Sequence, residues 1–136
     1  MTIEVRGCFM KRYFRIMLGG KSKFAAEAYK ENYIGMDFLP NNDLTGHFPD
    51  NWRDFNKRFI PVYMHQHPDK TKIAAGLACG ALWSLGKGIQ KGDIVLCPDG
   101  SGKYYIGEII GEYEYHKDRN LPHIRSVRWF SETIER

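Results

Sequence analysis

Apolar and polar positions alternate most regularly between Gly92 and Phe130, and this stretch organises our prediction of the fold. The apolar run after its opening Gly-Asp pair predicts a strand, and the Pro-Asp-Gly-Ser-Gly segment at 98–102 supplies residues that turns prefer. The β-branched and aromatic residues of 103–110 predict the returning strand of a hairpin, and Gly111 is placed for a bulge. A last strand is predicted at 123–130. Short strands and turns at this spacing favour a small, curved, barrel-like sheet.

The first part of the chain predicts elements that complete or cover this sheet. Apolar periodicity and turn residues indicate a strand at 13–18, a helix at 22–30, a strand at 33–39 and a polar loop at 40–50. Ser22 is the expected N-cap of the helix, and Asn32 suits the left-handed residue that ends it.

Two further helices are predicted in the middle of the chain. Asn51 and Asp54 form a capping pair for the first, in which Pro61 predicts a kink or break near Ile60. The second, Lys70 to Leu85, has the strongest helical periodicity. Its expected buried stripe consists of Ile73, Ala74, Leu77, Ala78, Ala81, Leu82 and Leu85.

Another face of this second helix carries Gly76, Cys79, Gly80 and Trp83. Glycine inside a helix costs about 1 kcal/mol relative to alanine, so two on one face indicate that something approaches closely. Tight packing against the sheet is one interpretation. Room for a ligand beside Trp83 is the other.

Composition places few further limits on the function. The 136 residues predict one domain, 1–136, with 43% hydrophobic and 26% charged residues, as in ordinary globular proteins. The formal net charge of +4 permits a polyanionic partner without requiring one. No apolar run has the length of a membrane span, so we expect no membrane partner.

The cysteines and histidines do not form a metal-binding pattern. Cys8, Cys79 and Cys97 are widely spaced, and the histidines complete no zinc motif. We therefore expect reduced thiols in a cytoplasmic protein, no structural metal and no cofactor.

No catalytic motif is present, which favours a binding domain over an enzyme. The segment Leu18-Gly19-Gly20-Lys21-Ser22 ends in Lys-Ser before a helix, but it lacks the first glycine of a phosphate-binding loop. Aromatic residues make up 14% of the chain, and several are candidates for a partly open, base-stacking surface: Tyr33, Phe38, Trp52, Trp83, Tyr113, Tyr115 and Trp129. Basic residues lie between these segments and would contact nucleic-acid phosphates, in particular Lys21, Lys23 and Arg125.

The order of these elements resembles the PUA-like superfamily, particularly EVE and YTH domains. The resemblance rests on Tyr13-Phe14-Arg15-Ile16-Met17, on Tyr33-Ile34-Gly35-Met36-Asp37-Phe38, and on the hairpin that begins Gly92-Asp93-Ile94-Val95. The whole chain also looks like the N-terminal domain of modification-dependent restriction proteins. The resemblance implies an α+β fold, a PUA-like small curved β-barrel flanked by helices. It also allows the chain to be part of a longer multidomain protein.

The resemblance further implies a DNA-binding specificity domain that recognises a modified base by base flipping, within a restriction endonuclease or related defence protein. By position, the base pocket would consist of Met36, Asp37, Phe38, Trp83, Cys97 and Asp99. Gly35 or Met36 stands where a YTH cage tryptophan is expected, which indicates a different base or another aromatic supplier.

Two rival functions keep the same fold. A PUA-type module would bind RNA, with dependence on single strands and on the 2′-hydroxyl. An enzyme would use the pocket as an active site, which requires His47 or His123 to lie beside Cys97.

Overall fold

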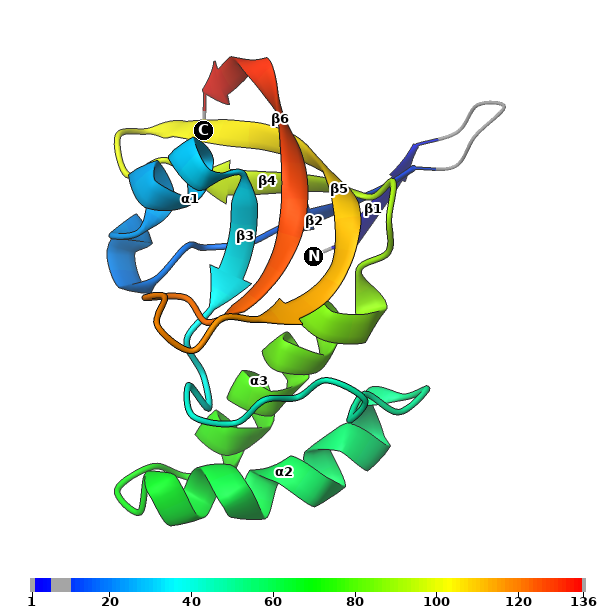
Figure 1. Ribbon diagram of the computed structural model, residues 1–136, viewed down its shortest axis with the longest axis vertical. Helices are drawn as coiled ribbons and strands as arrows, with labels where there is room; N and C mark the ends of the chain where they lie inside the picture. Colours follow the sequence, from blue (N-terminus) through cyan, green and yellow to red (C-terminus); the bar gives the residue numbers. More distant parts are fainter. Residues whose placement is uncertain (1, 6–10, 136) are drawn as a thin grey trace.

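The computed structural model describes residues 2–5 and 11–135, and its fold is α+β, as predicted (Figure 1). The strands join one mixed sheet, and the helix pair α2–α3 packs below it. The elements are β1 (Thr2–Val5), β2 (Lys11–Arg15), α1 (Ala25–Glu31), β3 (Tyr33–Met36), α2 (Trp52–Gln66), α3 (Lys72–Trp83), β4 (Ile94–Pro98), β5 (Lys103–Tyr115) and β6 (His123–Glu135). A short 3-10 turn, Gly20–Ser22, precedes α1, and a π-helical turn, Ser84–Gly88, follows α3.

The sheet has the strand order β1-β2-β4-β5-β6-β3 and curves strongly in space (Figure 1). Only the β2–β4 pair is parallel among the strands that the structure describes. The register of β5 against β6 shifts between Ile109 and Tyr113, which confirms the bulge predicted at Gly111. Because β3 and β1 end the order without pairing with each other, the described sheet is open, and the closed barrel is not formed by its hydrogen bonds.

Three local predictions, at Asn32, Asn51 and Asp99, are confirmed. Asn32 ends α1 in the left-handed conformation, with φ 60° and ψ 49°. The Asn51 side chain accepts a hydrogen bond from the Asp54 N–H at 2.9 Å and so caps α2. The Asp99 carboxylate accepts from the N–H groups of Ser101 and Lys103 and closes the β4–β5 turn.

Other predicted boundaries are wrong. Ser22 does not cap α1, which begins at Ala25 without a side-chain cap, because Ser22 itself lies in the preceding 3-10 turn. Helix α2 continues through Pro61, so the predicted break near Ile60 does not occur, and the alternative of a kink there stays a prediction. Strand β6 continues past Phe130 to Glu135, because residues 133–135 pair with the start of β5.

The predicted stripe of α3 is only partly buried. Ala78, Leu82 and Leu85 are buried as predicted, whereas Ile73 and Leu77 are 78% and 72% exposed. Small residues outside the stripe, Ala75 and Cys79, are buried in addition, which permits a close approach of α3 to α2. A Cβ atom added at Gly80 would meet no atom within 4 Å, so packing against the sheet does not explain that glycine.

A buried arginine, Arg125 of β6, connects the helix pair to the sheet. Its side chain is 1% exposed and donates to the carbonyls of Leu85, Ile89 and Gly111. The first two carbonyls belong to the turn after α3, where free carbonyls and the helix dipole favour a cation. The third belongs to the β5 bulge. Burial lowers the pKa of Arg125 from its ordinary value, but arginine stays charged in proteins.

We predict that Arg125→Met lowers the free energy of unfolding by about 3 kcal/mol or more, because three buried carbonyls lose charged donors. Urea unfolding followed by circular dichroism measures the change. The control is Arg128→Met on the same strand, whose side chain is 59% exposed and pairs with Glu108. That change should cost about 1 kcal/mol or less. Equal effects of the two substitutions would show that Arg125 does not hold the helices to the sheet.

Candidate functional site

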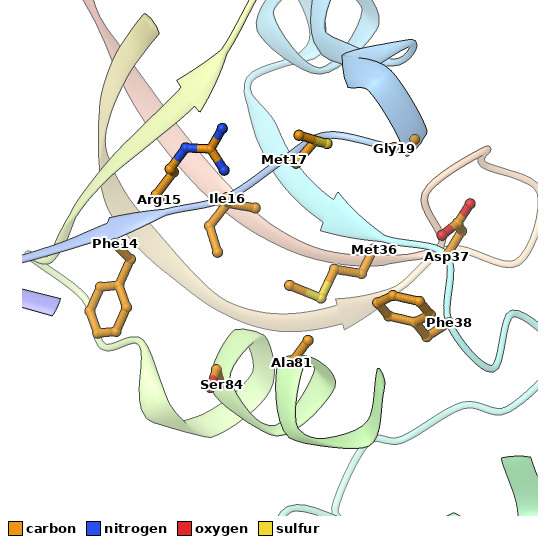
Figure 2. Close-up of a pocket in the computed structure, with 11 residues that line it drawn as sticks. Phe14, Arg15, Ile16, Met17, Gly19, Met36, Asp37, Phe38, Ala81 and Ser84 are labelled. Atoms are coloured by element: carbon orange, nitrogen blue, oxygen red, sulfur yellow. The ribbon is translucent and has the colours of Figure 1, made fainter. Parts of the chain in front are cut away.

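The main candidate site is a cleft of about 510 Å³ between the C-terminal ends of β2 and β3, with α3 as its floor (Figure 2). We call it the β2–β3 cleft. It lies where the curved sheet does not close, and its volume is in the range of about 300–1,000 Å³ that small-molecule sites have. The residues that line it are Phe14, Arg15, Ile16, Met17, Gly19, Gly20, Met36, Asp37, Phe38, Ala81 and Ser84.

Strand alternation divides these residues into an apolar interior and a polar rim. Phe14 and Ile16 of the β2 wall point into the space above α3, as Met36 and Phe38 do from the β3 wall (Figure 2). Arg15 and Asp37, which alternate with them along the strands, point away from α3 and line the opposite edge of the cleft. The interior of the cleft therefore contains two aromatic rings and the Met36 thioether, which suit a flat apolar ligand. One cation and one carboxylate lie at the edge of the cleft.

Backbone strain is concentrated on the two walls of the cleft. Non-glycine residues with positive φ include Lys21 (56°) and Ser22 (59°) after the β2 wall, and Leu39 (49°) after the β3 wall. Gly19, which lines the cleft, has φ 83°. For residues other than glycine such conformations cost about 1–3 kcal/mol each, and they tend to occur at ligand sites.

The β3 wall is held by hydrogen bonds to the loop that follows Phe38. The ring of His123 bonds the Leu39 carbonyl through Nε2 (2.8 Å) and the Tyr113 hydroxyl through Nδ1 (2.7 Å). The Tyr113 hydroxyl also accepts from the Leu44 N–H at 3.1 Å. A second tyrosine, Tyr115, donates to the Pro40 carbonyl at 2.8 Å.

These partners fix the state of His123. A carbonyl only accepts, so Nε2 carries the proton, and Nδ1 accepts from the Tyr113 hydroxyl in the neutral ring. Burial lowers the pKa of His123 and raises the pKa of Tyr113 to about 12. The neutral pair is therefore the stable one near pH 7, and it positions Phe38 beside the cleft.

The structure brings together half of the predicted base pocket. Met36, Asp37 and Phe38 line the β2–β3 cleft. Trp83 does not line it, because its indole N–H donates to the Pro49 carbonyl at 2.8 Å and the ring lines a different cleft, between α2 and α3.

Two other predicted pocket residues are corrected. Cys97 is fully buried in the sheet core, and burial raises the pKa of its thiol. Asp99 lies in the β4–β5 turn, where hydrogen bonds from Ser101 hold the pKa of its carboxyl below the usual value. Neither side chain faces the cleft, and the position of these residues in the predicted strand and turn did not show this.

Of the predicted phosphate contacts, Lys21 and Lys23 are exposed, next to Gly19 and Gly20 of the cleft. Arg125 is not a phosphate contact, because its guanidinium is buried against carbonyls. Arg15, which the prediction did not include, is exposed at the rim, and its Nε donates to the Tyr104 hydroxyl at 3.1 Å.

Sequence reasoning missed most of the β2 wall and the α3 floor. Phe14, Ile16 and Met17, which is 43% exposed, were predicted only as parts of a strand at 13–18. Alternation along 13–18 could have placed Phe14 and Ile16 on one face. The contribution of Ala81 and Ser84 depends on the docking of α3 and has no local signal.

The side chains named for the enzymatic alternative have other contacts in the structure. Both ring nitrogens of His123 are bonded to the partners described above, and the His47 ring packs against Phe59, on the helix side of the molecule. Cys97 lies in the separate sheet core. Within residues 2–5 and 11–135, no group of three or more His, Cys, Asp or Glu side chains could hold a metal ion.

Two more predictions concern the thiols and the aromatic surface. Cys79 and Cys97 are free and buried, whereas Cys8 lies outside the described residues. Tyr33 is 1% exposed and does not belong to an open surface, whereas Trp52 is 45% exposed.

In the described part of the chain, no helix has the length and hydrophobicity needed to cross a membrane.

Comparison with known proteins identifies the family but not the activity. The profile of DUF8426, a domain of unknown function, matches residues 14–136. The chain belongs to the DUF8426 family. Searches of curated proteins and of solved structures each gave no match. The DUF8426 match includes both walls of the β2–β3 cleft and the α3 floor, and the similarity to EVE and YTH domains stays a prediction.

We predict that stability is constant above about pH 6.5 and falls below it, because the unfolded chain then binds a proton that buried His123 does not. The free energy of unfolding should fall by at most about 1.4 kcal/mol per pH unit between the unfolded pKa and the lowered folded pKa. Urea unfolding at a series of pH values measures this slope.

The substitution His123→Gln should remove most of the slope between pH 6.5 and 5 (a range of about 1.5 units), whereas His65→Gln, on the exposed side of α2, should keep it. A slope unchanged in the His123 variant would show that another group titrates.

Proposed function

We propose that this domain binds nucleic acid and holds one base, flipped out of its stack, in the β2–β3 cleft. The single observation that carries the proposal is the composition of that cleft: an apolar interior with two aromatic rings and exposed cations around its mouth.

The interior suits a flat aromatic ligand. Phe14 and Phe38 stand on opposite walls, and the flexible thioether of Met36 lies between them (Figure 2). Stacking of a base on an aromatic side chain is worth about 1–3 kcal/mol and can replace the stacking that the base gives up on flipping. A methyl or similar group on the base would add apolar contact in such an interior.

The rim supplies polar recognition. The Asp37 carboxylate accepts hydrogen bonds, which suits the exocyclic amino group of a base. Edge strand β3 also presents backbone groups that no neighbouring strand of the described sheet pairs. Arg15, Lys21 and Lys23 are exposed around the mouth and would hold the flanking phosphates.

The finer fold and the biological setting are part of the same proposal. The curved sheet with helices packed at one end supports a PUA-like architecture of the EVE or YTH type, in which the open seam forms the pocket. On this proposal the domain is the modified-base reader of a restriction-type defence protein and acts in the cytoplasm, with DNA as its partner. Any nuclease or NTPase activity would belong to other domains.

Binding to matched ligands tests the proposal. Purified chain is titrated with duplexes that contain no modification, 5-methylcytosine, 5-hydroxymethylcytosine or N6-methyladenine, and with single-stranded RNA, all at one near-physiological salt concentration. We expect a preference for one modified duplex. Preference for RNA that depends on the 2′-hydroxyl would instead identify the PUA-type alternative. Equal, weak and salt-sensitive binding to every ligand would contradict base recognition.

We predict that cleft and rim substitutions have different effects. Phe38→Leu keeps apolar packing but removes the ring face, so it should reduce the preference for the modified base by about 1–3 kcal/mol. Lys21→Ala or Lys23→Ala should weaken the binding of all nucleic acids alike. Each should also lower the slope of log affinity against log salt concentration by about 1 for each phosphate that the lysine no longer neutralises.

Two controls make the result specific. Phe130→Leu changes a half-buried ring outside the cleft, and Lys70→Ala removes an exposed charge at the distant α2–α3 turn. Neither should alter selectivity or salt dependence. If Phe38→Leu and the lysine variants changed affinity in the same way for all ligands, the pocket assignment would be wrong.

A further inference from the structure

A second cleft, of about 360 Å³, lies between α2 and α3 and adjoins the β2–β3 cleft. We call it the α2–α3 cleft. Trp52, Asn56, Gly80 and Trp83 are among its lining residues. Ala81 and Ser84 line both clefts. The ridge between the two sites therefore carries small side chains, which a chain-like ligand could cross.

Internal packing does not explain the open side of the α2–α3 cleft. Trp52 is 45% exposed and Leu77, which also lines the cleft, is 72% exposed. A Cβ atom at Gly80 would meet nothing within 4 Å. Glycine thus leaves the floor of the cleft open, although alanine would favour the helix by about 1 kcal/mol.

A buried polar atom at this cleft also lacks a partner. Asn56 is 7% exposed and donates through Nδ2 to the Gly76 carbonyl at 3.2 Å. Its Oδ1 is buried and accepts no hydrogen bond in the described part of the chain. Unsatisfied buried acceptors are rare in folded proteins, and a donor from a ligand would satisfy this one.

The aromatic ring and the charges favour a nucleotide as that ligand. The Arg53 guanidinium lies over the Trp52 ring, 4.8 Å from its centre, an arrangement that couples a stacking surface to a phosphate-binding cation. Lys57 and Lys72 are exposed on the same two helices. The acids nearby already have partners, since Asp54 bonds Asn51 and Asp50 pairs with Lys87 at 3.7 Å.

We propose that the α2–α3 cleft binds the nucleotide next to the base held in the β2–β3 cleft, with its base stacked on Trp52. This inference rests on the proposed function. It specifies the ligand further: two neighbouring bases leave their stack together, so the bound segment is single-stranded or locally melted. An exocyclic amino group on the second base would donate to Asn56 Oδ1.

The test uses deoxycytidine oligonucleotides, whose bases carry an exocyclic amino group, of one, two, four and eight nucleotides at one low salt concentration, with affinity measured by fluorescence anisotropy or calorimetry. The variants are Trp52→Ala, Trp52→Phe, Phe38→Leu and, as an exposed apolar control, Ile134→Ala, whose side chain is 44% exposed. Stacking on Trp52 predicts that Trp52→Ala weakens the two-, four- and eight-nucleotide ligands about tenfold. The mononucleotide should bind as before, Trp52→Phe should keep most of the affinity, and Ile134→Ala should change nothing.

The outcomes separate this inference from the proposed function. If Phe38→Leu weakens binding and Trp52→Ala does not, the second site is wrong while base binding in the first cleft stands. If neither variant weakens binding, both proposals fail. An equal loss of affinity for the mononucleotide in Trp52→Ala would also overturn the second site. So would a change in self-association by sedimentation without a change in oligonucleotide affinity, since the exposed apolar face would then be a protein contact.

Discussion

The packing of the helices against the sheet depends most on the burial of one positive charge, that of Arg125. A guanidinium removed from water needs partners in fixed positions, and here they are carbonyls of the turn after α3 and of the β5 bulge. The bulge and the helix end therefore have to meet at one place. Since α3 provides the floor of the β2–β3 cleft, the same contact sets the depth of the candidate site.

The site itself is a consequence of a sheet that curves without closing. β3 pairs with β6, and at Gly35 this contact is so close that an added Cβ would lie 2.7 Å from the His123 carbonyl. β2 pairs with β4 on the other side of the sheet. The walls of the cleft are thus held by different neighbours, and strand alternation puts apolar side chains inside and charges at the rim. The His123–Tyr113 network then fixes the wall that carries Phe38.

Features determined by neighbouring residues were predictable from the sequence. The β4–β5 hairpin, the left-handed Asn32, the Asn51 cap and the bulge at Gly111 all follow from local chemistry and are confirmed. The cleft residues 36–38 lie at the end of the strand predicted at 33–39, and they were named as pocket residues by position, from the resemblance to EVE and YTH domains.

Features determined by long-range packing were not predictable. Arg125 looked like a surface cation, because nothing near it in sequence shows that carbonyls far along the chain surround it. Part of the face that α3 buries was misassigned for a similar reason. Periodicity shows that a helix has an apolar side, but docking against α2 decides which of its residues are covered, and it leaves Ile73 and Leu77 exposed. Cys97 and Asp99 were placed by strand position, without knowledge of which way each side chain faces.

The most direct test of the central claim is a map of where a nucleic-acid ligand touches the isotope-labelled domain. Amide chemical shifts would be followed during titration with a short oligonucleotide that carries the preferred base. The account predicts saturable shifts at residues 14–20 and 36–38 and at Ala81 and Ser84, the two walls and the floor of one cleft. Shifts confined to scattered lysines, or to a face that excludes these residues, would contradict it.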